Sequence, residues 1–245
     1  MSLLAAWLGR VGYLDGWRLQ EAVATRVREG DDERLLLLEH DPVYTIGRRG
    51  TVQHLLVDLG ELRRDGASVF GVDRGGDITY HGPGQLVGYP IVRLGDRADL
   101  VGYVRGLESA IGDVLATYGV ASRAERGKTG VWVDLPDGRP SKIAAIGVRV
   151  SRGVTTHGFA LNVSTDLRAF DRMVPCGFMH EVASLERLGV GATVDEVARR
   201  VAATLSARLA RRLSWDAVEP AQDDEIPADA PVRGAIDLTR EVVAA

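Results

Sequence analysis

The spacing of apolar positions predicts three main helices. The clearest spans 99–119, where apolar side chains recur at the helical period, Asp99 is suited to cap the amino end and Gly119 to end the helix. A second helix is expected over 15–30. A third opens at Thr193, whose capping-box spacing to Glu196 precedes another apolar stripe. Segment 55–64 is expected to be a short helix or a turn-rich connection.

Runs of apolar and β-branched residues predict the strands, at 34–39, 43–46, 68–72, 86–92 and 154–163. Two further runs, 130–134 and 142–150, flank an Asp-Gly turn and favour a hairpin. Strands outnumber helices and recur in hairpin-like groups. The expected class is therefore α+β, with a mixed, largely antiparallel sheet and flanking helices.

Segment 74–85, which reads RGGDITYHGPGQ, interrupts this pattern. Its glycines and proline exclude a regular helix, so we expect a loop between the strands at 68–72 and 86–92. Glycine lets a ligand approach the backbone, and Arg74, Thr79, Tyr80, His81 and Gln85 offer side-chain contacts. The alternative interpretation is a tight structural turn.

Composition narrows the class of protein. A hydrophobic content of 45% and a charged content of 26% over 245 residues are those of an ordinary globular chain, and a net charge of −4 argues against a polybasic nucleic-acid binder. No apolar stretch approaches membrane-spanning length, and the amino end lacks a leader pattern, so we expect a cytoplasmic protein without a membrane partner. One catalytic domain over 1–215 is expected, with an acidic, Ala/Pro-rich tail over 216–245 that is mobile or loosely packed. A monomer is expected, because no exposed apolar helix face stands out.

Lysine is rare in this chain. Of the 30 basic residues only Lys128 and Lys142 are lysines. A base-composition bias towards arginine codons explains most of this, yet a lysine kept against that bias invites a chemical reason, because a buried lysine can lose its proton and arginine cannot. Lys142 lies on an apolar strand, whereas Lys128 is interpreted as a solvated loop charge.

The only cysteine, Cys176, lies between Pro175 and Gly177. A lone cysteine is most often a small buried hydrophobe, but flanking turn residues favour a nucleophile. A single cysteine also excludes an internal disulfide and suits a reducing compartment. A nucleophilic thiol needs a base, and the residues alone leave His157, His180 and Lys142 as candidates.

Four motifs in register resemble the lipoyl (octanoyl) transferase family: segment 74–90, the KIAAIG run from Lys142, the HGFALN run from His157, and Pro-Cys-Gly at 175–177. The similarity covers residues 1–215. It implies a biotin/lipoate protein ligase-like fold and octanoyl transfer from acyl carrier protein to a lysine of lipoyl domains, those of 2-oxoacid dehydrogenase E2 subunits and of glycine cleavage H protein.

The resemblance also implies roles for individual residues. Cys176 becomes the acyl-thioester intermediate and Lys142 its base, with neither cofactor nor metal. The acyl and carrier-arm site would be lined by Arg74, Gly75, Gly76, Asp77, Ile78, Thr79, Tyr80, His81, Ala145, Ile146, Gly147, Gly158, Phe159 and Ala160.

Three other functions compete with this one. An ATP-dependent lipoate or octanoate ligase shares the fold, but has no role for the Pro-Cys-Gly motif. A non-catalytic carrier-binding scaffold has no reason to keep both Cys176 and Lys142. A Cys–His hydrolase would use His157 or His180 instead of Lys142. Whether His81 and His157 are catalytic or structural stays open at this stage, as do the preferred acceptor and the strictness of the acyl length.

Overall fold

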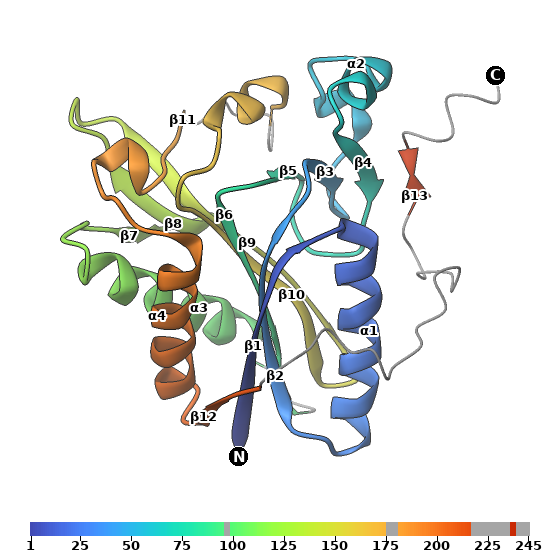
Figure 1. Cartoon of the computed structure of the whole chain (residues 1–245), viewed down its shortest axis with the longest axis vertical. Helices are drawn as coiled ribbons and strands as arrows, with labels where there is room; N and C mark the ends of the chain where they lie inside the picture. Colours follow the sequence, from blue (N-terminus) through green and yellow to red (C-terminus); the bar gives the residue numbers. More distant parts are fainter. Residues whose placement is uncertain (96–98, 175–180, 217–235, 239–245) are drawn as a thin grey trace.

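The computed structural model describes residues 1–95, 99–174, 181–216 and 236–238. Its main sheet is mixed and curved, with the strand order β12-β1-β2-β6-β10-β9-β8-β7 and β11 beside β9 (Figure 1). The strands are β1 (Ser2–Val11), β2 (Glu33–His40), β6 (Gln85–Ile91), β7 (Arg123–Glu125), β8 (Lys128–Asp134), β9 (Pro140–Ser151), β10 (Val154–Asn162), β11 (Glu181–Val182) and β12 (Arg212–Trp215). Within the described main sheet, the pairs β12/β1, β1/β2 and β11/β9 are parallel, and the other pairs are antiparallel. The predicted mixed, largely antiparallel class is confirmed.

A smaller sheet lies beside one end of the main one, in the order β13-β4-β3-β5. It consists of β13 (Ile236–Asp237), β4 (Ser68–Gly71), β3 (Val43–Ile46) and β5 (Ile78–His81). The described part of the predicted tail therefore includes a short strand paired with β4.

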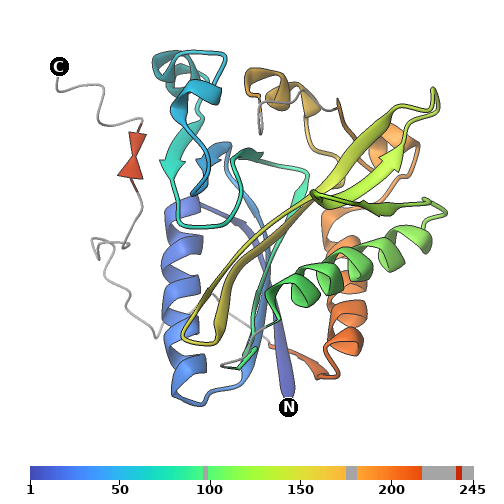
Figure 2. The same ribbon diagram turned by 180° about the vertical axis from the view of Figure 1, so that it is seen from behind.

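Helices cover both faces of the main sheet (Figures 1 and 2). On one face α1 (Tyr13–Glu29) buries Ala24 and Val27 against β2 and β6. On the other face α3 (Leu100–Ala116) and α4 (Val194–Arg208) pack together over a larger apolar cluster. The short helices are α2 (Leu59–Arg64), η1 (Val52–His54), η2 (Leu167–Arg172) and η4 (Glu186–Leu188). Among the described residues, no helix is long and apolar enough to span a membrane.

Local signals placed the helix starts well. Thr193 and Glu196 form the predicted capping box at α4, and the Asp99 carboxylate accepts a hydrogen bond from the Gly102 N–H at the start of α3. The hairpin of β8 and β9 is confirmed by their antiparallel pairing. Helix α1 begins at Tyr13, two residues before the predicted start.

Six of the described strands were not predicted: β1, β5, β7, β11, β12 and β13. The interpretation of 74–85 as a continuous loop is wrong, because Ile78–His81 forms β5 and pairs with β3. Strand β1 was missed altogether. It lies between β12 and β2, and its side chains enter different apolar clusters on the two faces, Leu3 and Ala5 in one and Ala6 in the other. A strand buried on both sides lacks the polar–apolar alternation that identifies half-exposed strands.

Candidate functional site

The glycine-rich segment lies across the middle of the main sheet. The N–H of Gly75 donates to the carbonyl of Val148 at 3.1 Å, and a Cβ at Gly147 would lie 2.8 Å from the Gly75 oxygen. Gly147 in turn pairs with Gly158 on β10. The three expected groups of site residues, 74–81, 145–147 and 158–160, are thus brought together.

Arg74 is held inside the protein. Its Nη2 donates to the Thr45 carbonyl at 2.6 Å, and its Nε to Thr45 Oγ1 at 3.2 Å. The backbone N–H groups of the following loop donate back to the glycine-rich segment, Gly47 to Asp77 and Arg48 to Arg74. The Arg74 guanidinium therefore fixes the segment's shape.

The other residues of this segment divide between two sides. The Asp77 carboxylate accepts the Ile78 N–H at 2.7 Å and lies 2.8 Å from Nδ1 of His54. Ile78 and Tyr80 belong to the apolar cluster of the small sheet. Tyr80 also meets the Phe170 ring edge-on, at 5.7 Å between centroids. Thr79 is half-buried on the alternate side of β5.

A directed chain of hydrogen bonds starts at Arg74. A guanidinium can only donate, so Thr45 Oγ1 accepts from it and is free to donate to Nε2 of His81 at 3.5 Å. His81 then carries its proton on Nδ1 and donates to Oε1 of Gln85 at 2.8 Å. Gln85 donates to Oδ1 of Asn162 at 2.9 Å, and Asn162 donates to the Ala183 carbonyl at 3.0 Å.

This series of hydrogen bonds ends beside β9, the strand of Lys142, because the Ala183 N–H donates to the Lys142 carbonyl at 2.9 Å. His81 is buried, both of its ring nitrogens are hydrogen-bonded within the network, and burial holds its pKa well below the usual value. A neutral histidine with both nitrogens occupied holds the site together and is not poised to take a proton. These contacts favour a structural role for His81.

The contacts of His157 also favour a structural role. Its backbone has a φ of +56°, a left-handed conformation that is costly for histidine. Its N–H donates to Oε1 of Gln20 at 2.7 Å, and its Nε2 lies 2.7 Å from Oδ1 of Asp73. Burial lowers the pKa of His157, and contact with the Asp73 carboxylate opposes that effect. Asp73 directly precedes Arg74, so His157 anchors the start of the glycine-rich segment.

Lys142 lies half-buried on β9, opposite Trp132 of β8. Its Nζ is 4.9 Å from the centroid of the Trp132 ring. Ile146 pairs with Phe159, and Ala145 with Ala160, further along the same hairpin. Lys142 is therefore on the strand that carries the expected acyl-site residues. Lys128 is exposed, as predicted, but its expected place in a loop is wrong, because it is the first residue of β8.

Cys176, Gly177 and His180 lie outside the described residues. The described chain on either side of them is anchored. The Val174 N–H donates to the His54 carbonyl at 2.9 Å, and Val182 pairs with Lys142.

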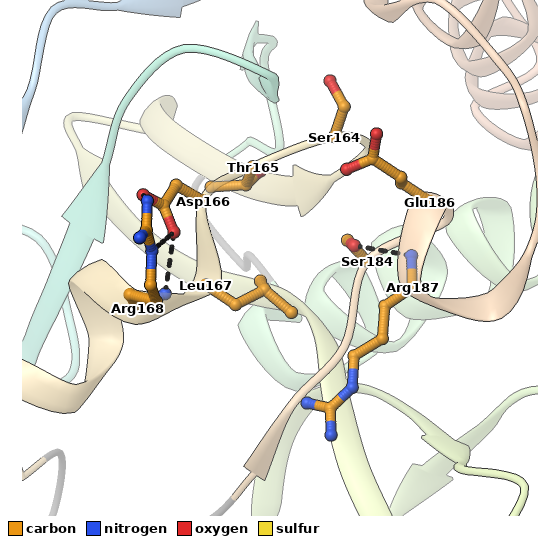
Figure 3. Close-up of a pocket in the computed structure, with 8 residues that line it drawn as sticks. All are labelled: Ser164, Thr165, Asp166, Leu167, Arg168, Ser184, Glu186 and Arg187. Atoms are coloured by element: carbon orange, nitrogen blue, oxygen red, sulfur yellow. Dashed lines mark hydrogen bonds and ion pairs between the residues drawn. The ribbon is translucent and has the colours of Figure 1, made fainter.

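A pocket of about 450 Å³ opens beside these flanking segments (Figure 3). Its lining is mainly polar, and Leu167 is the one aliphatic side chain: Ser164, Thr165, Asp166, Leu167, Arg168, Ser184, Glu186 and Arg187. In Figure 3 the Glu186 carboxylate is turned toward Ser164, across from the Arg168–Asp166 ion pair. Such a lining suits a polar group, because burying an alkyl chain requires apolar contacts. In the described ranges no group of three His, Cys, Asp or Glu side chains is arranged to hold a metal ion.

Gln85 was expected to offer a side-chain contact to a ligand, and Asn162 was quoted within a motif without a role. Sequence reasoning did not single out Thr45 or Trp132. Gln85 begins β6 and Asn162 ends β10, and a polar amide at a strand end can be recognised in a sequence. The hydrogen bond between them spans 77 residues of sequence and forms only when β6 and β10 pair.

Comparison with known proteins places the chain in a family. The model of the lipoyl protein ligase A/B catalytic domain matches residues 12–206. The chain belongs to this family. It is 50% identical over 195 residues to the octanoyltransferase of Solibacter usitatus, covering 79% of this chain and 86% of that protein. It is 49% identical to the octanoyltransferase of Mycolicibacterium smegmatis, covering 84% of this chain and 89% of that one.

Solved structures of lipoyl protein ligases share the fold. A lipoate protein ligase from T. acidophilum with bound lipoic acid superposes with a TM-score of 0.72 at 22% identity, covering 88% of this chain and 89% of that one. The biotin protein ligase of Aquifex aeolicus in complex with biotin and ATP gives a TM-score of 0.51 at 14% identity, covering 85% and 70%. The expected biotin/lipoate ligase-like fold is confirmed.

Proposed function

We propose that this chain moves an octanoyl group from acyl carrier protein to a lysine of a lipoyl domain, through a thioester on Cys176. The assignment of the transferase activity rests on the similarity to relatives. At 46–50% identity over most of its length to proteins named octanoyltransferase, the chain is an octanoyltransferase of protein lipoylation. The donor, the covalent intermediate and the residue roles are the proposal.

The pairing of Val182 with Lys142 supports the catalytic pair more than any other observation. Val182 follows Cys176 by six residues, so the chain beyond the thiol returns directly to the strand of the lysine. Lys142 is half-buried on β9, so its side chain is partly shielded from water. We therefore assign Lys142 as the base and Cys176 as the nucleophile.

The reaction then runs in two halves. Lys142 takes the thiol proton, the Cys176 sulfur attacks the donor carbonyl, and the carrier thiol leaves with a proton returned by Lys142. In the second half Lys142 accepts a proton from the acceptor amine as that amine attacks the octanoyl thioester. N–H groups near Gly177 would hold the oxyanion in both halves.

The expected acyl site is retained as part of the proposal. The glycine backbone of 75–76 lies against the β9–β10 hairpin, which carries the small or apolar residues 145–147 and 158–160. Burying an eight-carbon chain at about 0.8 kcal/mol per CH₂ is worth on the order of 5 kcal/mol, enough to select for length. A thioester donor brings its own activation, so the proposal requires neither ATP nor a metal.

Intact-protein mass spectrometry with octanoyl-acyl carrier protein and no ATP tests the covalent step. The expected result is a mass gain of one octanoyl group that is absent in Cys176→Ala and is discharged by a lipoyl domain. Transfer that occurs only with ATP and free octanoate would instead identify a ligase. Binding of carrier domains without chemistry under either condition would identify a scaffold.

The base is tested by exchanging lysine for arginine at two positions. Lys142→Arg keeps the charge but cannot accept a proton at working pH, so we expect kcat to fall by about 10²-fold or more. Lys128→Arg makes the same change at the other lysine and should retain activity. Substantial activity in Lys142→Arg would direct attention to a histidine base.

A further inference from the structure

Both lysines of the chain lie over the same indole ring. Nζ of Lys142 is 4.9 Å and Nζ of Lys128 is 5.2 Å from the centroid of Trp132. The other 28 basic residues are arginines. The Trp132 side chain is almost completely buried, at 1% exposure. The face of a tryptophan ring attracts a cation, and more strongly where water is excluded.

The backbone explains why Lys142 reaches the ring. Trp132 pairs with Lys142, whereas the neighbouring pair is Val131 with Ala144, so Ile143 is an extra residue on β9. Ile143 and Ala144 consequently both enter the same apolar cluster, in place of the usual alternation. Bulges of this kind re-aim the side chains next to them.

The Gly130 backbone lies against the lysine stem. It adopts a φ of +121°, and a Cβ there would lie 3.4 Å from Cδ and Cε of Lys142 and 2.6 Å from the Ala144 oxygen. Its N–H donates to Oε1 of the buried Glu108 on α3 at 2.9 Å. The Lys142 side chain thus contacts the Gly130 backbone along its methylene stem and the Trp132 ring at its amine, and Glu108 on α3 holds Gly130 in place.

We propose that Trp132 is a positioning residue for Lys142: its ring holds the amine at one place and favours its charged form. This inference rests on the proposed function for the role of Lys142 as base. When the S–H bond breaks and an N–H bond forms on Nζ, the ring stabilises the resulting ammonium until the proton passes to the leaving thiol.

Other charges facing this part of β9 come from three elements. Lys128 on β8 acts against the charge of Lys142, because it places a second cation on the same ring. Glu108 on α3 is paired with Arg105, and Glu181 on β11 with Arg187. Both carboxylates are engaged in these pairs, and the ring face is a contact that favours the ammonium over the amine.

The scarcity of lysine makes a direct measurement possible. Reductive methylation with ¹³C-formaldehyde labels Lys128, Lys142 and the amino terminus and keeps their charges, and Lys128→Arg assigns the signals. We expect the methyl signal of Lys142 to be shifted upfield by the ring current. In Trp132→Leu that shift should vanish, and the titration midpoint of Lys142 should fall by up to about one pH unit, with Trp132→Phe intermediate.

Kinetics of the unmethylated variants complete the test. In Trp132→Phe, kcat for octanoyl transfer should fall several-fold with little change in KM, while Lys128→Arg stays near the parent. A Lys142 signal without an upfield shift in the parent, or a midpoint unchanged by Trp132→Phe and Trp132→Leu, would overturn the proposal. If the parent transfers no octanoyl group while the ring-current shift is present, the proposed function fails and the positioning contact stands.

Discussion

At the scale of single residues, the hydrogen-bond chain from Arg74 to Ala183 has a defined direction. Each amide in it uses its oxygen toward one neighbour and its nitrogen toward the next, as Gln85 does between His81 and Asn162. Because an arginine stands at the donating end, no member can be reversed without placing two donors or two acceptors together. The site is therefore sensitive to changes that preserve shape and alter only donor and acceptor roles.

Asn162→Asp tests that sensitivity. The substitution replaces an N–H donor with an oxygen facing the Ala183 carbonyl and adds a charge at a buried position. We expect the free energy of unfolding to fall by about 3 kcal/mol at neutral pH. Urea denaturation measures it. Gln53→Glu makes the equivalent change on the exposed η1 helix and should alter stability by less than about 0.5 kcal/mol. Equal stability of the two variants would contradict the directed chain.

At the scale of elements, the pairing of β6, β10 and β9 requires glycine at positions where a side chain would clash with the neighbouring strand. A Cβ at Gly158 would lie 2.2 Å from the Gly88 oxygen and 2.6 Å from Cδ of Pro90. A Cβ at Gly88 would lie 2.1 Å from the Phe159 ring, which covers the bare backbone there. The glycines of the HGFALN and KIAAIG motifs are thus required by contacts within the chain, whatever else they line.

Gly158→Ala should therefore be strongly destabilising. The backbone atoms it meets cannot move without breaking the pairing of β10, so we expect a loss of about 3 kcal/mol or more, measured by thermal or urea unfolding. Gly106→Ala is the matched control. It lies in α3 with no atom within 4 Å of the added methyl and should gain up to about 1 kcal/mol from its higher helix propensity. A Gly158→Ala protein as stable as the parent would show that the strands can separate at no cost.

Some of these elements could be predicted from the sequence and others could not. Thr193, Asp99 and the Asp137-Gly138 turn predicted their helices and hairpin correctly, since caps and tight turns depend on neighbours in sequence. Strand β5 was hidden because its pairing with β3 is a long-range contact and the glycines around it suggested a loop. The segments that meet at the site could be named from motifs. The network connecting them could not, because it forms only when β6 pairs with β10 and β11 pairs with β9.

At the scale of the whole molecule, buried histidines couple stability to pH. His40 lies between the Val11 carbonyl, 2.8 Å from Nδ1, and the Tyr89 hydroxyl, 2.6 Å from Nε2. Burial lowers its pKa from 6.5 to about 4. Burial also lowers the pKa of His81 and of His157. All three side chains favour the neutral form in the folded state.

Acid should accordingly destabilise the fold well above the pH at which carboxylates titrate. Between pH 6.5 and about 4 the unfolded chain binds a proton at His40 that the folded chain does not, so the stability present above pH 6.5 is lost as pH falls. For His40 alone the loss is about 2 kcal/mol at pH 5. Urea unfolding at pH 7.5, 6 and 5 measures it, and His40→Gln should flatten the slope. Constant stability across this range would show that the histidines ionise freely in the fold.

The position of β12 has a consequence for how the molecule is made. Strand β1 pairs with β2 on one side and with β12, which is synthesised much later, on the other, with Ser2 beside Arg212 and Ala5 beside Trp215. The α4 helix that covers this corner also comes late in the chain. During synthesis one edge of β1 therefore stays unpaired until more than two hundred further residues have emerged. An open strand edge can pair with another chain. The nascent protein is therefore most exposed to association with other chains before β12 pairs with β1.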